Sequence, residues 1–139
     1  MRKFEIGGEK MTVEQIMRKR FLAFRETDRV GPVLDWMDQA QVVGGVVLNE
    51  KKQLVGLVYE KKLYQGLFQQ EYDPLQVIEN IMESKIITVD KNENWIKAAK
   101  KMRIYDLSIL PIVENGHVLG ILMLEDMLDQ FLLHIESGN

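Results

Sequence analysis

The sequence predicts an α/β fold made of two copies of one unit, each with the order strand, helix, strand, strand, helix, related by a pseudo-two-fold axis. The first observation is an internal repeat in which identical residues recur 65 positions later: Glu14 as Glu79, Ile16 as Ile81, Met17 as Met82 and Met37 as Met102. The second is that residues 54–58 match residues 118–122 at a step of 64, because the polar turn before them is one residue shorter in the second copy. Such short units cannot each bury a full core, so we expect them to pack together and to leave a cleft suited to binding.

The elements of the first copy follow from local signals. Thr12 and Gln15 have the spacing of a capping box, which predicts a short opening helix. Thr27 or Asp28 is expected to cap the next helix, whose apolar residues recur at helical spacing. The β-branched runs around the polar turn predict a hairpin. The expected order is a strand at residues 21–24, a helix from about residue 28, strands at 42–48 and 54–59, and a helix at 60–70.

The second copy is expected to begin at the seam before Asp73, so that the domains are residues 1–72, with an N-terminal extension, and residues 73–139. Asp73 is a good N-cap and Pro74 suits the first helical position, which predicts a helix at residues 75–82. The remaining order repeats that of the first copy: a strand at 86–89, a helix at 93–104, strands at 108–113 and 118–123, and a long last helix with a broad apolar stripe.

Composition excludes several classes of protein. With 139 residues and a formal net charge of −3, the chain lacks the basic bias of a dedicated nucleic-acid binder. It has no cysteine, which excludes disulfides and thiolate metal sites and fits a reducing compartment. Its longest apolar run, residues 42–48, is too short to span a membrane, and the N-terminus lacks the apolar stretch of a secretion signal. We therefore expect a cytoplasmic protein without a membrane span, a metal site or a cofactor.

The residues at the joints of the two copies resemble those of a tandem pair of CBS domains, the module named for cystathionine β-synthase. The resemblance runs from about Thr12 to Ile135 and implies a regulatory module that is not an enzyme. It rests on the order in which these residues occur: Ile16-Met17 and Ile81-Met82 at the start of each copy, then residues 110–113 and 118–121, and then residues 125–127 at the start of the last helix.

The resemblance also implies a ligand site for an adenosine-type molecule, namely AMP, ADP, ATP or S-adenosylmethionine, in the cleft between the repeats. The family motif has a hydroxyl residue followed three positions later by an aspartate, which accepts hydrogen bonds from the two ribose hydroxyls. In the second copy Asp126 is present, whereas Met123 replaces the hydroxyl residue. The residues that the resemblance places around the ligand are Ser84, Ile87, Thr88, Ser108, Ile109, Pro111, Met123 and Asp126.

The first copy is expected to have a degenerate site, because Lys62 stands where the aspartate belongs and an ammonium group accepts no hydrogen bond. The corresponding residues are Leu22, Gly44, Val46, Tyr59 and Lys62. One adenosine-type ligand per chain is therefore predicted.

Each of these residues has an alternative interpretation. Asp126 is equally an acid at a helix N-terminus, stabilised by the helix dipole. Residues 18–20 are basic and could contact a phosphate, but a solvated surface is the favoured interpretation. The glycines at 44 and 45 indicate either a close approach of a ligand or a bulge, of which the bulge is favoured. No histidine, carboxylate or serine pattern supports a metal site or nucleophilic catalysis.

The function predicted from the sequence is a non-enzymatic sensor that passes its ligand occupancy to an unknown effector protein or domain. The alternative is a ligand-free module for dimerisation or protein interaction. A homodimer is expected in both cases, because a helix as apolar as the last one would expose a large patch in a monomer. The surface expected to meet the partner is the apolar stripe of the last helix together with Leu63 and Leu67, although part of that stripe must build the core. The stripe consists of Leu124, Met127, Leu128, Phe131, Leu132 and Ile135. Phe131→Glu should weaken the dimer if Phe131 faces the partner and not the core.

Overall fold

A computed structural model describes residues 10–137 of the chain. The chain divides into two compact units, of which unit 1 combines the residues up to Lys19 with those from Ile87 onward, and unit 2 comprises Arg20–Ile86. The boundaries between the units therefore lie at residues 19/20 and 86/87, and not at the seam between residues 72 and 73. Each repeat contributes its leading segment, residues 11–18 or 76–83, to the unit that contains the sheet of the other repeat.

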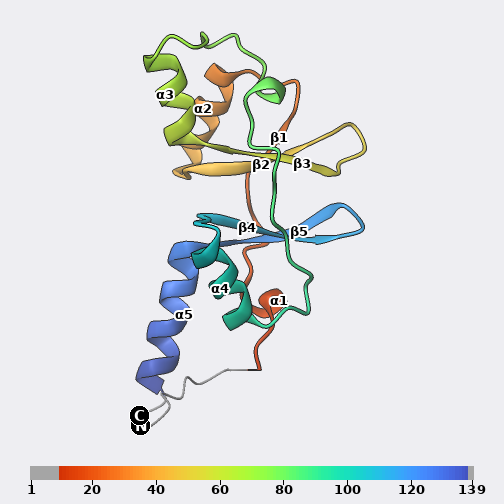
Figure 1. The fold of residues 1–139 in the computed structure, drawn as a ribbon, viewed down its shortest axis with the longest axis vertical. Coiled ribbons are helices and arrows are strands. Elements are labelled where there is room, and N and C mark those ends of the chain that lie inside the picture. Colours follow the sequence, from red (N-terminus) through yellow and green to blue (C-terminus); the bar gives the residue numbers. More distant parts are fainter. Residues whose placement is uncertain (1–9, 138–139) are drawn as a thin grey trace. The chain divides into compact units, whose positions relative to one another are not determined.

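Unit 2 contains a three-stranded sheet in the order β1-β2-β3, with β1 parallel and β3 antiparallel to β2. Helices α2 and α3 lie on the same side of this sheet (Figure 1). Phe24, Met37 and Ile78 are among the largest side chains in its core. The elements are β1 (Ala23–Arg25), α2 (Val30–Ala40), β2 (Gly44–Leu48), β3 (Leu54–Tyr59), α3 (Glu60–Phe68) and the 3₁₀ turn η1 (Ile78–Asn80).

Unit 1 contains the antiparallel hairpin of β4 and β5, with α1, α4 and α5 on one side of it (Figure 1). Trp95 lies at the centre of its core, fully buried, and its ring packs against Phe131 and His134 of α5. The elements are α1 (Val13–Ile16), α4 (Trp95–Ile104), β4 (Ile109–Glu114), β5 (His117–Met123) and α5 (Leu124–Ser137). The predicted α/β class and the element order of the two copies are confirmed, apart from the local corrections below.

The two leading segments are held by corresponding backbone hydrogen bonds. Val13 donates to the Glu93 carbonyl at 2.9 Å in unit 1, and 65 residues later Ile78 donates to the Asp28 carbonyl at 2.9 Å in unit 2. The same correspondence holds for Trp95 donating to Met11 at 3.1 Å and Val30 donating to Gln76 at 2.9 Å. The sequence repeat is therefore a repeat of tertiary structure, in which each leading segment makes the same contacts with the other repeat.

The prediction of a strand at residues 86–89 is wrong. Of these four residues only Val89 pairs, in a single parallel bridge with Ile112. In unit 2 the corresponding ladder is longer, and the Val46 N–H donates at 3.0 Å to the carbonyl group that precedes β1. The residue 65 positions after Val46 is Pro111, which has no N–H to donate. The hallmark proline of the second copy thus shortens its own sheet.

The helix expected at residues 75–82 is also wrong. The Asp73 carboxylate accepts the Leu75 N–H at 2.7 Å, and the Asp73 carbonyl accepts the Gln76 N–H at 3.0 Å. These bonds close a turn around Pro74, so that only Ile78–Asn80 remains helical, as the 3₁₀ turn η1. An aspartate followed by proline begins turns as readily as helices.

The caps agree only in part with the sequence. The capping box of α1 is confirmed, since the Thr12 N–H donates to the Gln15 side chain at 2.8 Å. The expected cap of α2 is wrong, because the Asp28 carboxylate instead accepts the Arg25 N–H at 2.8 Å and α2 begins after Arg29.

The bulge favoured for the glycines at 44 and 45 is wrong, because the register shift of this hairpin lies between Val47 and Leu48. A Cβ atom on Gly45 would lie 2.7 Å from the Phe24 ring and 2.9 Å from the Leu22 carbonyl oxygen. Gly45 therefore permits close packing between β2 and β1.

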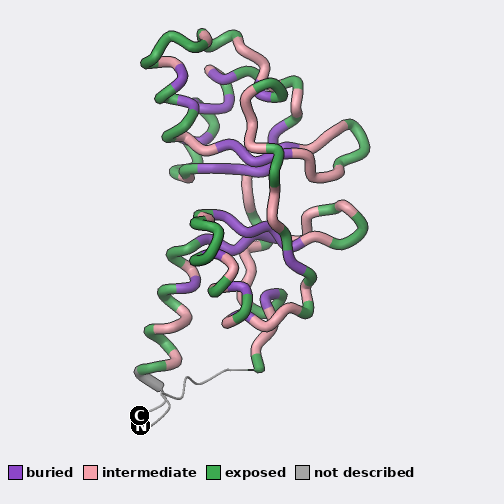
Figure 2. Tube along the Cα trace, in the orientation of Figure 1, coloured by how far each residue is buried: buried purple, intermediate pink, exposed green. Residues whose placement is uncertain are grey.

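Burial along α5 changes the surface predicted for a partner (Figure 2). Phe131 faces the core of unit 1, where its ring centroid lies 4.7 Å from that of Trp95. Leu63 is buried and Leu67 packs against the core of unit 2. These three residues therefore belong to the part of the predicted surface that builds the core, and Phe131→Glu does not test a dimer. The exposed apolar residues on these helices include Leu124, Leu128 and Leu132 on α5 and Tyr64 and Phe68 on α3.

Within residues 10–137, none of the helices has the combination of length and hydrophobicity that a bilayer crossing requires.

Candidate functional site

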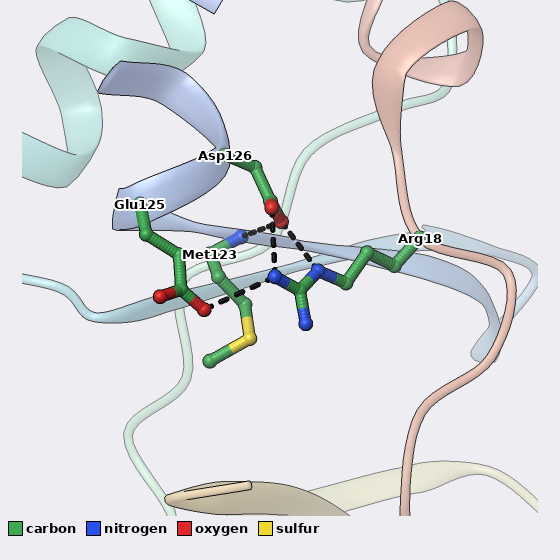
Figure 3. A network of polar contacts seen from close by, with 4 residues as sticks. All are labelled: Arg18, Met123, Glu125 and Asp126. Atoms are coloured by element: carbon green, nitrogen blue, oxygen red, sulfur yellow. Dashed lines mark hydrogen bonds and ion pairs between the residues drawn. The ribbon is translucent and has the colours of Figure 1, made fainter. Parts of the chain in front are cut away.

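Asp126 lies in the first turn of α5, directly after β5, and its carboxylate binds the guanidinium of Arg18 in a two-pronged contact (Figure 3). Arg18 Nε donates to Oδ2 at 2.7 Å and Nη2 donates to Oδ1 at 2.8 Å. The Met123 N–H also points at Oδ2, at 3.3 Å. The side chain of Asp126 is 19% exposed and that of Arg18 is 38% exposed, so the pair lies at the edge of unit 1, where solvent reaches it.

The backbone brings Arg18 to this position. The Arg18 N–H donates to the Ile121 carbonyl at 2.9 Å, and the Ile121 N–H donates back at 3.0 Å, so that the leading segment forms a bridge with β5. Gly120 allows this approach, because a Cβ atom there would lie 2.7 Å from the Arg18 carbonyl oxygen and 2.6 Å from the Met17 sulfur. Main-chain contacts therefore hold Arg18 near Asp126 whatever its side chain binds.

Electrostatics favour the pairing further. The hydrogen bond to Asp126 and the negative charges of Asp126 and Glu125 outweigh partial burial and raise the pKa of the Arg18 guanidinium. Glu125 contributes a second contact, which Arg18 Nη2 makes with its carboxylate at 3.0 Å. A carboxylate offers about four acceptor positions, and three donors already point at that of Asp126. The two hydroxyls of a ribose therefore can both bind this carboxylate only when the guanidinium withdraws at least in part.

Unit 2 contains the counterpart of this arrangement with the charges exchanged. Glu83, 65 residues after Arg18, forms the same bridge with β3, through two hydrogen bonds of 2.9 Å with Leu57. Its carboxylate pairs with Lys62, 64 residues before Asp126, at 3.7 Å. In unit 1 the carboxylate belongs to the helix, as Asp126 of α5, and the cation to the leading segment, as Arg18. In unit 2 the cation belongs to the helix, as Lys62 of α3, and the carboxylate to the leading segment.

A pocket of about 650 Å³ opens in unit 2 beside Lys62 and Glu83. Burial and the negative charge of Glu83 raise the pKa of the Tyr59 hydroxyl in its wall, so this group is a neutral donor at ordinary pH. The pocket is lined by residues from β3, from α3 and from the segment that follows it: Leu57, Val58, Tyr59, Lys62, Leu63, Gln65, Gly66, Gln69, Glu71, Tyr72, Gln76, Asn80, Ile81, Met82 and Glu83.

Residues 78–132 match the sequence model of the CBS domain. The crystal structure of the CBS domain pair of protein MJ0100, in complex with 5′-methylthioadenosine and S-adenosyl-L-methionine, superimposes with a TM-score of 0.79, at 24% identity over 87% of this chain and 95% of that chain. The chain folds as a pair of CBS domains. The cytosolic domain of the Mg²⁺ channel MgtE in complex with ATP is similar as well, with a TM-score of 0.75 and 28% identity over 87% of this chain and 49% of that one.

The curated relatives of this CBS pair are longer proteins. Arabinose 5-phosphate isomerase KdsD from Francisella tularensis is 28% identical over an alignment of 122 positions, which covers 85% of this chain and 37% of the isomerase. In three curated relatives the CBS pair spans less than two thirds of the length, from 17% to 61%.

In this CBS pair, the other residues predicted to surround an adenosine-type ligand differ in how far solvent reaches their side chains. Ile109 and Pro111 are buried within β4, and the Pro111 carbonyl accepts the Val89 N–H at 3.1 Å. The Ser108 carbonyl accepts the Leu124 N–H at 3.1 Å, which joins β4 to the start of α5. Along the segment before Val89, Ile87 is half-buried against the core and Thr88 is exposed.

Ser84 belongs to unit 2, next to the Glu83 that pairs with Lys62, whereas Asp126 and the predicted residues from Ile87 onward belong to unit 1. The side chain that contacts Asp126 is that of Arg18. Of the predicted degenerate site, Tyr59 and Lys62 line the pocket of unit 2. Gly44 and Val46 are buried in β2, and Leu22 packs against the core.

The sequence interpretation missed the role of Arg18, which it treated as part of a solvated basic run. A signal was present, because both members of the pair change sign between the copies: Arg18 corresponds to Glu83, and Asp126 corresponds to Lys62. A double reversal of charge at two repeat positions is what an ion pair between them would leave in the sequence.

Proposed function

We propose that this CBS pair is a non-enzymatic regulatory module that binds an adenosine-type ligand at Asp126 and passes its occupancy to an effector, either an attached domain or a separate protein. The observation that carries the proposal is the Asp126 carboxylate at the start of α5, partly open to solvent. An ionised carboxylate is a pure acceptor and is suited to two vicinal hydroxyls.

The ligands of similar structures support this class. One similar CBS pair contains 5′-methylthioadenosine and S-adenosylmethionine, and another similar domain contains ATP. The part that these molecules share is adenosine, whose ribose presents two adjacent hydroxyls. Around it, within unit 1, we propose contacts from Ile87, Thr88, Ser108 and Met123, with Ile109 and Pro111 contributing through the backbone.

Calorimetric titration with AMP, ADP, ATP and S-adenosylmethionine tests this function. We expect at least one of them to bind, with one site per chain, because Lys62 cannot accept ribose hydroxyls. The 2′-deoxy form of the best nucleotide should bind about tenfold more weakly or worse, since a hydrogen bond to a charged acceptor contributes about 1.5–3 kcal/mol. Two equivalent sites per chain would contradict the assignment to Asp126 alone.

The alternative function is a ligand-free module for dimerisation or protein interaction. It is favoured by the same ion pair, since Arg18 occupies the acceptor that a ribose would need. Absence of binding by all four ligands would select this alternative.

We further propose that the CBS pair forms a homodimer through the exposed faces of α3 and α5. The step of 64 relates Tyr64 to Leu128 and Phe68 to Leu132, so that both copies present apolar side chains at corresponding positions. Phe68 is 91% exposed and Leu132 is 59% exposed, which is a surface suited to a second copy of the chain.

Leu128→Glu is expected to convert a dimer into a monomer, because it would bury a charge in the centre of an apolar interface. Sedimentation equilibrium at micromolar concentration measures this directly. Asp129→Ala, an exposed change on the next position of α5, should leave the dimer intact. A parent chain that sediments as a monomer at high micromolar concentration would exclude the proposed dimer.

A further inference from the structure

We propose that Arg18 determines which adenosine ligand the site accepts, so that ligands with a phosphate group attached directly to the ribose, as in AMP, ADP and ATP, are preferred over adenosine, which has no charge there, and over S-adenosylmethionine, which has a sulfonium cation there. This inference rests on the proposed ribose contact of Asp126. It assigns to Arg18 a role in specificity and names the ligand class as adenine nucleotides.

The first step of the argument is that the acceptor is already occupied. Arg18 contacts both oxygens of Asp126, at 2.7 and 2.8 Å, and Met123 adds a third donor. A ribose diol that binds the same two oxygens has to displace at least one arm of the guanidinium. Ligand binding is therefore an exchange of one donor set for another.

The second step concerns the displaced guanidinium. Its backbone is fixed by the bridge with Ile121, so the charge remains beside the site after its side chain turns away. Glu125 is the remaining anionic partner that it contacts in unit 1, and the Glu125 side chain is 65% exposed. Contacts with so exposed a carboxylate are weak, so Glu125 compensates only in part for the loss of Asp126.

The third step is the chemistry of the replacement partner. A phosphate group matches the planar fork of arginine and binds it through charge-assisted hydrogen bonds. A nucleotide thus supplies hydroxyls to Asp126 and an anion to Arg18, and the original ion pair is exchanged for two new contacts. Adenosine supplies only the hydroxyls. S-adenosylmethionine carries a sulfonium cation next to the ribose, which repels the displaced guanidinium, and its carboxylate lies farther from the ribose, beyond that cation.

Unit 2 supports the assignment by contrast. The residue that corresponds to Arg18 there is Glu83, and Lys62 replaces the acceptor. A site with those charges can bind neither a ribose diol through Lys62 nor a phosphate through Glu83. Selection for nucleotides is therefore expected in unit 1 alone.

The test compares AMP, adenosine and S-adenosylmethionine by calorimetry on the full chain, for the parent and for Arg18→Gln. The parent should bind AMP at least about tenfold more tightly than adenosine. In Arg18→Gln the affinity for AMP should fall and that for adenosine should rise, because the acceptor is vacated, so that the ratio approaches one. Lys19→Gln removes a neighbouring exposed charge and should leave the ratio unchanged.

A second variant keeps the test decisive should Arg18→Gln not fold. Arg18→Lys retains the charge without the planar fork, and its preference for AMP over adenosine should fall at least about threefold. The assignment of Arg18 is overturned where the parent binds adenosine or S-adenosylmethionine as tightly as AMP, or where a folded variant keeps the ratio of the parent. In both cases the binding function itself stands. A parent that binds none of the three ligands contradicts the proposed function and this inference together.

Discussion

Trp95→Ala is expected to lower the free energy of unfolding by about 3–5 kcal/mol, the usual cost of removing a buried aromatic side chain and leaving a cavity. Trp95 is fully buried at the start of α4, and its ring centroid lies 4.7 Å from that of Phe131 and 5.5 Å from that of His134. It therefore joins α4 to α5 in the core of unit 1. The backbone N–H of residue 95 donates to the Met11 carbonyl at 3.1 Å, and the alanine variant keeps this bond, so the expected loss is that of the side chain alone.

Trp36→Ala is the matched control, because it removes the other tryptophan of the chain. Trp36 is 45% exposed and stacks on Phe24 with ring centroids 5.9 Å apart. We expect a loss of about 1 kcal/mol, since little burial is removed with the stacking contact. Urea denaturation followed by far-UV circular dichroism measures both variants. Equal midpoints for the two variants would show that Trp95 does not centre the core of unit 1.

Much of the fold could be predicted because the repeat constrains the two copies together. The periodicity of apolar residues identified α2, α4 and both hairpins with ends within a few residues of the structure. The prediction of a tandem CBS pair, which rested on the order of weak motifs, is confirmed. A pattern repeated twice is a stronger signal than any of its members, since chance similarity would have to recur at the same spacing.

The failures share a physical cause, namely competition between local signals and tertiary contacts. Residues around Asp73 carry a helix-start signal, but the carboxylate closes a turn there. The strand predicted at residues 86–89 is apolar enough, yet Pro111 lacks the N–H that would extend its pairing beyond Val89. Along α5 the apolar stripe is wide enough for two surfaces, and the sequence alone could not assign Phe131 to the core and Leu128 to the exposed side.

The sequence predicted Asp126 as the acidic residue of the candidate site, but it did not predict that Arg18 pairs with this acid. Asp126 follows from the repeat position at the start of the last helix. Arg18 lies 108 residues away in the chain, and its contact depends on the exchange of leading segments between the repeats. No local pattern contains that exchange. The reversed charges of Glu83 and Lys62 indicate it only once the two copies are aligned.

The largest expected effect on binding is that of Asp126→Ala, which should weaken the best adenosine nucleotide by about ten- to a hundredfold, since hydrogen bonds to a charged group contribute about 1.5–3 kcal/mol. The same change should alter stability much less. The two-pronged, part-buried ion pair with Arg18 contributes about 1 kcal/mol, and an acid in the first turn of a helix contributes about 0.3–1 kcal/mol. Binding and stability therefore separate the ribose role of Asp126 from a structural one.

Glu125→Ala is the control for this measurement, because Glu125 also contacts Arg18, at 3.0 Å, and adjoins Asp126 in the same turn. Glu125 has no proposed contact with the ribose, so the nucleotide affinity of the Glu125→Ala variant should stay within about threefold of that of the parent. Calorimetry and thermal melts on the parent and both variants complete the comparison. An Asp126→Ala variant that binds as tightly as the parent but melts earlier would assign Asp126 to the ion pair and the helix start alone. The module would then act through its surface, as the ligand-free alternative predicts.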